Sequence, residues 1–152
     1  MKPYPHRYLA AASGRPEGAV TLAAPALESF PTAAPADIAG PGDLWGPEAL
    51  LTATLADCIV LTFRAVADAS HFRWNALECR TEGELDRIDG ITQFSRFATM
   101  ARLTIPAGAS EERARRLLEK AERDCPVANS LRGLRTLHIE VITSRAPEMH
   151  LA

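Results

Sequence analysis

The chain has 152 residues, with a hydrophobic share of 47% and a charged share of 24%, which is ordinary for one globular domain. This composition excludes a disordered tail and a collagen-like rod. The 17 basic and 19 acidic residues give a formal charge of −2, without the basic excess that is typical of nucleic-acid binders. Three cysteines are too few for a disulfide scaffold, and an odd number leaves at least one thiol unpaired.

No targeting or membrane segment is predicted. The start of the sequence lacks an apolar leader region, and the longest apolar stretch, 50–63, contains Asp57. That stretch is also shorter than the ~20 residues that a bilayer span needs. We therefore expect a cytoplasmic protein that binds neither membrane nor nucleic acid. In a reducing compartment a cysteine is more often catalytic, redox-active or buried than locked in a disulfide.

The first fifty residues contain eight of the eleven prolines, which excludes a long helix there because proline removes a backbone donor. Short apolar runs at 8–11 and 19–22 flank a turn that contains glycine and proline, a pattern typical of a hairpin. We assign residues 1–27 to an N-terminal hairpin and residues 28–46 to a loop.

A buried helix is predicted over residues 47–70. Pro47 and Glu48 are typical of a helix start, and the segment that follows is apolar on nearly every face. Such a helix is buried on all sides. One small domain rarely encloses a helix this completely, so we expect a second copy of the chain to cover it, as a homodimer.

Residues 71–152 are predicted to form strands and a second helix. Apolar and polar residues alternate over 72–80 and 94–105, which favours two strands joined by a turn at 88–91. A closing strand is expected over 136–144. The resulting order, β-β-α-β-β-α-β, predicts an α+β fold.

The second helix is predicted over 111–124, with Ser110 as its N-terminal cap. Cys125 precedes Pro126 and is expected to end it, because the residue before proline avoids helical backbone angles. The basic cluster of this helix is expected to be a solvated face without a function. It consists of Arg113, Arg115 and Arg116.

The common motifs of phosphate and metal sites are absent from the sequence, which has no Gly-rich phosphate loop, no Cys-x-x-Cys and no His-Glu-x-x-His. The four histidines, at 6, 71, 138 and 150, are scattered and are expected to be structural or solvated. From the residues alone, Cys58 and Cys125 are either nucleophiles or inert core thiols. Cys79, on a predicted strand, is interpreted as structural.

Three local motifs are similar to those of the OsmC/Ohr family of thiol peroxidases. They are Pro47-Glu48 followed by Cys58, then Cys125-Pro126-x-x-Asn129-Ser130, and the Gly14-Arg15-Pro16 turn. The resemblance covers nearly the whole chain. It implies one OsmC-like domain over 1–152, with antiparallel sheets around a buried central helix, in an intertwined homodimer.

By this resemblance, Cys58 is the peroxidatic thiol and Cys125 the resolving thiol, while Arg15 is the activating cation and Glu48 orients it. The substrate implied is an organic hydroperoxide. A thiolate attacks the peroxide, and the sulfenic acid that forms condenses with a second thiol to a disulfide. No metal or bound organic cofactor is expected. A dithiol reductant, either a lipoyl protein or a small thiol, must then reduce the disulfide.

The surroundings of Cys58 raise two further expectations. Apolar residues such as Leu51, Leu55 and Ile59 are expected to line the site. Glu48 and Cys58 lie about 15 Å apart along one helix, so two antiparallel copies of the helix would bring the partner's Glu48 to Cys58.

Two departures from the family leave alternatives open. Asp57 stands directly before Cys58, where the family usually has a small residue, and the aromatic stretch of the Ohr branch is missing. The branch, OsmC or Ohr, therefore stays open. One alternative is a dimeric binding or stress-associated protein with this fold but without peroxidase turnover. The other is a structural role for both cysteines.

Overall fold

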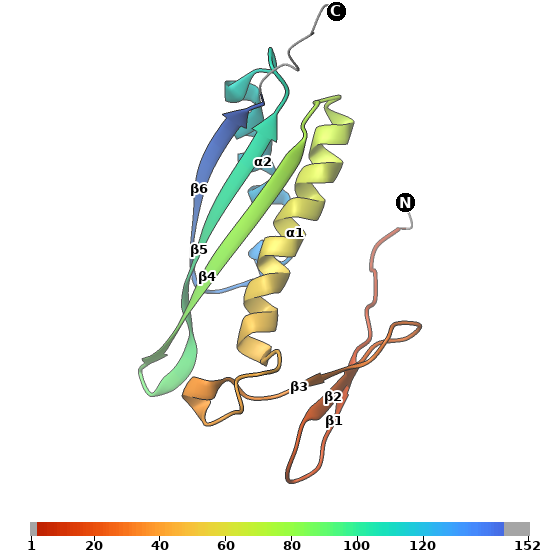
Figure 1. Ribbon diagram of the computed structural model, residues 1–152, viewed down its shortest axis with the longest axis vertical. Coiled ribbons are helices and arrows are strands. Elements are labelled where there is room, and N and C mark those ends of the chain that lie inside the picture. Colours follow the sequence, from red (N-terminus) through yellow and green to blue (C-terminus); the bar gives the residue numbers. More distant parts are fainter. Residues whose placement is uncertain (1–2, 145–152) are drawn as a thin grey trace, which may run out of the picture. The chain divides into compact units, whose positions relative to one another are not determined.

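The computed structural model describes residues 3–144, and the chain divides into two compact units, Met1–Leu50 and Leu51–Ala152 (Figure 1). The first unit contains the N-terminal strands and the start of the first helix. The second unit contains the rest of that helix, a larger sheet and the second helix. The expectation of one domain over the whole chain stays a prediction.

The sheet of the first unit has three antiparallel strands in the order β1-β2-β3. Strands β1 (Ala11–Ser13) and β2 (Val20–Ala23) confirm the predicted hairpin, although its first strand begins later than the apolar pattern indicates. Strand β3 (Phe30–Thr32) and the short 3-10 helix η1 (Ala36–Ile38) lie within the predicted loop. Pro31 concealed β3, because proline cannot donate to a sheet and is tolerated mainly on an edge strand.

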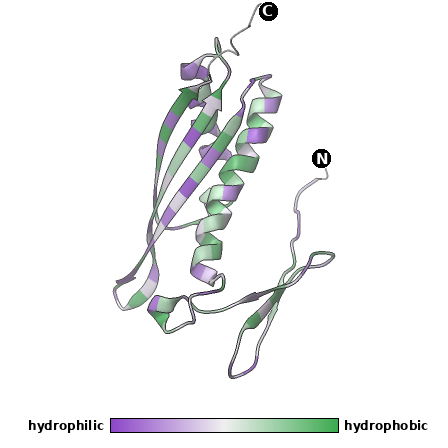
Figure 2. Ribbon diagram, in the orientation of Figure 1, coloured by the Kyte–Doolittle hydropathy of each residue, from purple (hydrophilic) through white to green (hydrophobic). Residues whose placement is uncertain are grey.

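Helix α1 (Pro47–Ala69) forms where the sequence predicts it, and its apolar character extends along most of its length (Figure 2). In the single chain one side of α1 is buried. The residues of that side are Leu55, Ile59, Phe63, Val66 and Ala67. Leu51, one turn before the buried Leu55, is 37% exposed and Leu61 is 50% exposed, so burial of the whole helix would need a further layer. Cover by a second copy stays a prediction.

Helix α1 is longer than the apolar stretch from which the sequence argument excluded a membrane span. By length and composition alone it could cross a bilayer, a test that core helices of soluble proteins also pass. The absence of membrane binding therefore stays a prediction.

The sheet of the second unit contains β4 (Ala76–Ile88), β5 (Ile91–Ile105) and β6 (Leu134–Thr143), in the order β4-β5-β6. Strands β4 and β5 form an antiparallel hairpin, as the sequence predicts. Strand β6 is parallel to β5, so the expectation of purely antiparallel sheets is wrong for this pair. Parallel neighbours need a long crossover, and helix α2 (Glu111–Asp124) provides it.

Helix α2 begins and ends as predicted. The Ser110 side chain accepts a hydrogen bond from the backbone N–H of Arg113 at 3.1 Å, which satisfies one of the free donors at the helix start. Cys125 has extended backbone angles and ends the helix before Pro126. The short 3-10 helix η2 (Ala128–Ser130) follows.

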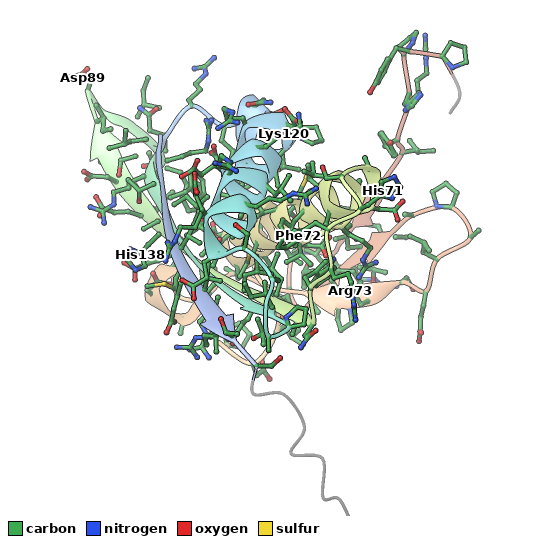
Figure 3. The ribbon with its side chains drawn as sticks, turned by 90° about the horizontal axis from the view of Figure 1, so that it is seen from above. His71, Phe72, Arg73, Asp89, Lys120 and His138 are labelled. Carbon is green, nitrogen blue, oxygen red and sulfur yellow. The ribbon has the colours of Figure 1, made fainter. Side chains whose placement is uncertain are left out.

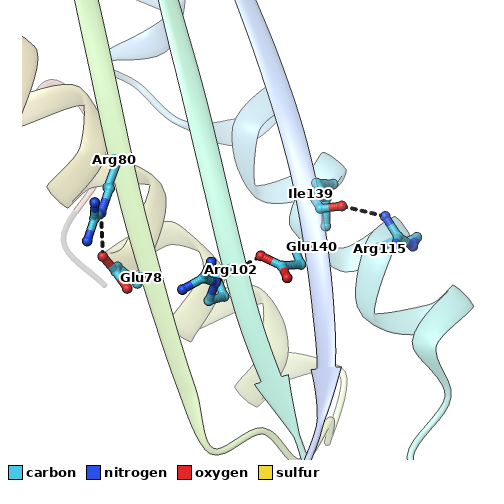
Figure 4. A network of polar contacts seen from close by, with 6 residues as sticks. All are labelled: Glu78, Arg80, Arg102, Arg115, Ile139 and Glu140. Atoms are coloured by element: carbon cyan, nitrogen blue, oxygen red, sulfur yellow. Dashed lines mark hydrogen bonds and ion pairs between the residues drawn. The ribbon is translucent and has the colours of Figure 1, made fainter.

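Both helices pack on one face of the larger sheet, where they lie side by side in two perpendicular views (Figures 1 and 3). The odd-numbered side chains of β5 from Phe97 to Ile105 are buried on this face and form a single core with α1 and α2. Exposed ion pairs lie on the opposite face, among them Arg80–Glu78 at 2.6 Å and Arg102–Glu140 at 2.8 Å (Figure 4). Exposed pairs of this kind contribute little to stability.

The three arginines of α2 are exposed, as the sequence predicts, and each also makes a polar contact. Arg113 donates a hydrogen bond to the carbonyl of Ser70 at 2.5 Å, and Arg116 pairs with Glu112. Arg115 donates to the carbonyl of Ile139 at 2.7 Å (Figure 4). Strand β6 lies at the edge of its sheet, so Arg115 occupies a carbonyl that would otherwise be free to pair with another strand.

Gly83 on β4 allows α1 to approach the sheet closely. A Cβ atom at this position would lie 2.7 Å from Oγ1 of Thr52 and 2.8 Å from Cε1 of Phe94. We expect Gly83→Ala to lower the free energy of unfolding by about 1–3 kcal/mol, because extra atoms in a packed core displace their neighbours. Urea unfolding followed by circular dichroism measures this change.

The matched control for that measurement is Glu82→Ala. Glu82 is the exposed neighbour of Gly83 on the same strand, and its replacement should change stability by less than about 0.5 kcal/mol. Equal stability of Gly83→Ala and the wild type would contradict the close approach.

Candidate functional site

Cys58 lies at the border of the buried side of α1. Leu55 and Ile59, which flank it on the helix, are each 1% exposed, whereas Cys58 is half-buried and packs against the same core. Its Sγ lies 3.9 Å from Oγ1 of Thr62, one turn further along α1. This position keeps the sulfur in the core layer while leaving part of it accessible.

Cys125 is placed by the end of α2 and is completely buried. Its Sγ accepts hydrogen bonds from the backbone N–H groups of Ala128, at 3.4 Å, and of Val127. The carbonyl of Cys125 in turn accepts from the N–H of Asn129 at 3.0 Å. The turn after Pro126 thus encloses this sulfur with backbone donors.

The structure brings Cys58 and Cys125 together, with their sulfurs within hydrogen-bond reach of each other. Burial raises the pKa of the Cys125 thiol to about 11, and the hydrogen bond and charge of Cys58 contribute in the same direction. The two backbone N–H groups oppose this rise only in part. At neutral pH Cys125 therefore carries its proton and can donate it toward Cys58.

A second contact fixes how α2 lies along α1. Phe72 lies close to the end of α1 (Figure 3), and the guanidinium of Arg113 stacks over its ring at 5.7 Å from the centroid. The same guanidinium donates to the carbonyl of Ser70. The start of α2 is thereby held at the end of α1, while the end of α2 meets Cys58 in the middle of α1.

Cys79 does not belong to this pair. It is free, half-buried on β4 and packed against the core. Burial raises its pKa to about 11, and the nearby Glu78 carboxylate adds to the rise. A thiol held in its protonated form reacts slowly, which agrees with the structural role that the sequence analysis assigns to it.

Arg15 and Glu48 belong to the first unit, whereas the three cysteines belong to the second. Arg15 lies on the turn between β1 and β2 and lines a shallow hollow with Ser13, Glu17 and Thr21. Glu48 is in the first turn of α1, and its Oε2 atom is buried. Their approach to Cys58 stays a prediction.

The structure modifies two expectations about Cys58, namely which apolar residues line its site and what Asp57 does beside it. Leu55 and Ile59 belong to the closed core, so they pack beneath the sulfur and do not line an open crevice in the single chain. Leu51 is partly exposed, as a lining residue requires. Asp57, which departs from the family pattern, is exposed, so water and salt screen its carboxylate.

Among residues 3–144, no group of three or more histidine, cysteine, aspartate or glutamate side chains is arranged to hold a metal ion. His150 lies outside the described residues. The expectation of a site without metal or cofactor stays a prediction.

The sequence analysis did not identify Thr62 and Arg113 as part of the site. The spacing of Thr62, four positions after Cys58 on a predicted helix, places the two side chains on one face and was a usable signal. Arg113 had no such signal, because its partners, Ser70 and Phe72, are about forty positions away in the sequence and meet it only through the tertiary fold.

A comparison with protein-family models identifies one family. A family model described as OsmC-like protein matches residues 40–140. The uncharacterized protein YmaD of Bacillus subtilis (strain 168) is 24% identical over 109 residues, which is 70% of this chain and 73% of YmaD. The match to the family model crosses the boundary between the two units.

Solved structures share the fold. An OsmC-like protein of unknown function from Vibrio cholerae superposes with a TM-score of 0.81 at 15% identity, covering 90% of this chain and 100% of that one. An organic hydroperoxide resistance protein from Elizabethkingia anophelis gives 0.75 at 21%, covering 95% and 100%. One from Legionella pneumophila gives 0.70 at 24%, covering 92% and 99%.

These structures confirm the predicted α+β fold. In the described residues it consists of two α-helices and two three-stranded sheets. Since the family model covers more than half of the sequence, the chain belongs to the family of OsmC-like proteins.

Proposed function

We propose that this protein is a cysteine-based peroxidase that reduces organic hydroperoxides through a sulfenic acid on Cys58 and an intrachain disulfide between Cys58 and Cys125. The observation that carries the proposal is the meeting of a half-buried thiol with a fully buried one. The names of the structural neighbours from Elizabethkingia and Legionella, as organic hydroperoxide resistance proteins, support the same substrate class.

The unequal surroundings of the two sulfurs support the proposed roles. Cys58 is accessible to a peroxide, whereas Cys125 is enclosed and held in its thiol form. The Cys58 thiolate attacks the O–O bond of ROOH, takes one oxygen to become Cys58–SOH, and releases the alcohol ROH after proton uptake.

Resolution uses the sulfur that is already in contact. As the sulfur of Cys125 attacks the sulfur of Cys58–SOH, its proton passes to the departing hydroxyl. The S–S bond forms, the S–O bond breaks, and water leaves. A dithiol reductant, a lipoyl protein or a small thiol, then reduces the disulfide by thiol exchange and is itself oxidised. No metal or bound organic cofactor takes part.

The proposed assembly is a homodimer in the cytoplasm. The uncovered apolar residues of α1, such as Leu51 and Leu61, support cover by a second copy of the helix. We propose that Arg15 and Glu48 complete each site, with Arg15 as the cation beside the Cys58 thiolate and Glu48 orienting its guanidinium. A guanidinium favours the charged form of the thiol and can donate to the oxygen on which charge develops.

The alternative is a binding or stress-associated protein of the same fold without turnover. Intact mass spectrometry after one equivalent of cumene hydroperoxide separates the two. We expect each chain to lose two hydrogens, with peptide mapping placing the new bond between Cys58 and Cys125. Cys79→Ser should give the same result. An unchanged mass supports the binding protein, and a bond to Cys79 contradicts the assigned pair.

Removal of the resolving thiol should separate the two chemical steps. In Cys125→Ser the first oxidation still occurs, but the sulfenic acid on Cys58 persists and is labelled by dimedone. Turnover with a dithiol reductant should fall by about tenfold or more, because the Cys58–Cys125 disulfide that the dithiol reduces by thiol exchange can no longer form. Cys79→Ser is the matched control. Rapid turnover without Cys125 would show that resolution occurs elsewhere.

The shared site can be tested by mixing subunits. If the partner's Glu48 completes the site of Cys58, then Cys58→Ser and Glu48→Gln homodimers are each weakly active. Their mixed dimer contains one intact site, so random exchange should restore about a quarter of wild-type activity. Native mass spectrometry checks that the subunits have exchanged. If they have and the mixture still shows no gain in activity, Glu48 and Cys58 of one site belong to the same chain.

A further inference from the structure

Thr62 is the side chain of α1 that touches the reactive sulfur. Its Oγ1 lies 3.9 Å from Sγ of Cys58, and it is half-buried beside the core. The two residues are one helical turn apart, so the helix itself fixes their proximity. In the thiol form either atom can be the donor.

Ionisation of Cys58 would fix the direction of this contact. A thiolate has no proton and only accepts hydrogen bonds, so the Thr62 hydroxyl must then donate. A helical threonine ordinarily donates to the carbonyl four residues earlier, which here belongs to Cys58 itself. The hydroxyl can therefore turn from that carbonyl to the sulfur of the same residue, and hydrogen bonds to a charged acceptor are the stronger ones.

The other contact of the sulfur also comes from an uncharged donor. Cys125 approaches from the end of α2 and keeps its proton. Thr62 and Cys125 thus reach Cys58 from two different elements, one on the same helix and one across the helix pair. Water is largely excluded from the buried part of this sulfur, and there each such donor counts for more than it would in solvent.

In the described part of the second unit, few titratable groups on the elements around Cys58 could influence its thiol. On α1, the Asp57 carboxylate is exposed. On α2, Glu122 pairs with Arg135 of β6 at 3.0 Å. On β4, Cys79 is held as a thiol, and the inward side chains of β5 from Phe97 to Ile105 do not titrate. A change at Thr62 is therefore not masked by a nearby buried charge from these elements.

We propose that the Thr62 hydroxyl is a hydrogen-bond donor to the Cys58 thiolate and sets the fraction of this thiol that is reactive at neutral pH. The role in peroxide reduction rests on the proposed function, but the hydrogen bond itself does not. Thr62 acts together with Cys125 and without a charge of its own.

The test is the pH dependence of the alkylation rate of Cys58 by iodoacetamide, followed by peptide mass spectrometry on the reduced full-length protein. In Thr62→Val, which keeps the shape and removes the hydroxyl, the midpoint of this profile should rise by about 0.5–1 pH unit. At pH 7 the rate should fall by roughly 3- to 10-fold. Thr62→Ser should restore the wild-type profile.

The matched control is Thr136→Val, an exposed threonine at the edge strand β6, which should leave the profile unchanged. If Thr62→Val does not fold by circular dichroism, Thr62→Ala is used with the same expectation. An unchanged midpoint in a folded variant overturns the proposal. A Thr62→Ser profile equal to that of Thr62→Val also overturns it, since the methyl group would then be the cause.

Alkylation requires no peroxide, so the two proposals fail separately. A shifted profile in a protein that does not consume cumene hydroperoxide supports the role of Thr62 and contradicts the peroxidase. If the Thr62→Val profile is unshifted while the wild-type protein consumes cumene hydroperoxide rapidly, the peroxidase is supported and the role of Thr62 is contradicted.

Discussion

The contact between the two sulfurs depends on the register of α2 along α1. Two points fix this register, the Arg113–Ser70 hydrogen bond at one end and the Cys58–Cys125 contact at the other. Twelve positions separate Ser70 from Cys58, and twelve separate Arg113 from Cys125. Both segments are nearly all helical, so each spans about 18 Å. Antiparallel helices can therefore make both contacts at once, and a shift of one residue at either end would separate the sulfurs.

This register also gives two similar side chains different surroundings. Cys58 projects from the middle of a helix whose buried side ends beside it, whereas Cys125 ends a helix and is covered by the turn through Ala128. Burial penalises a charged sulfur, so the enclosed Cys125 keeps its proton. In the proposed reaction, peroxide attack and disulfide formation need no large movement between the two positions.

Local signals in the sequence were sufficient for the helices and for the main hairpin. Pro47, the Ser110 cap and Cys125-Pro126 mark helix ends that the structure has at the same places. Strand β3 was missed because Pro31 conceals an edge strand, and the parallel pairing of β6 was missed because strand direction depends on the crossover. The two cysteines came from a family motif, whereas Arg113 required tertiary contacts that no local pattern contains.

The apolar character of α1 links the cover of the helix to the chemistry of its cysteine. Cys58 lies at the border of the buried side of α1, on the same stripe of the helix as Leu51, seven positions earlier, and one turn before the exposed Leu61. In the proposed dimer, the layer that covers Leu51 and Leu61 also forms the outer wall around the sulfur. A purely apolar wall would remove water and disfavour the thiolate, so Thr62 and Cys125 alone would have to stabilise the charge. A wall that also brings a guanidinium, the role proposed for Arg15, removes water from the peroxide and stabilises the attacking sulfur together.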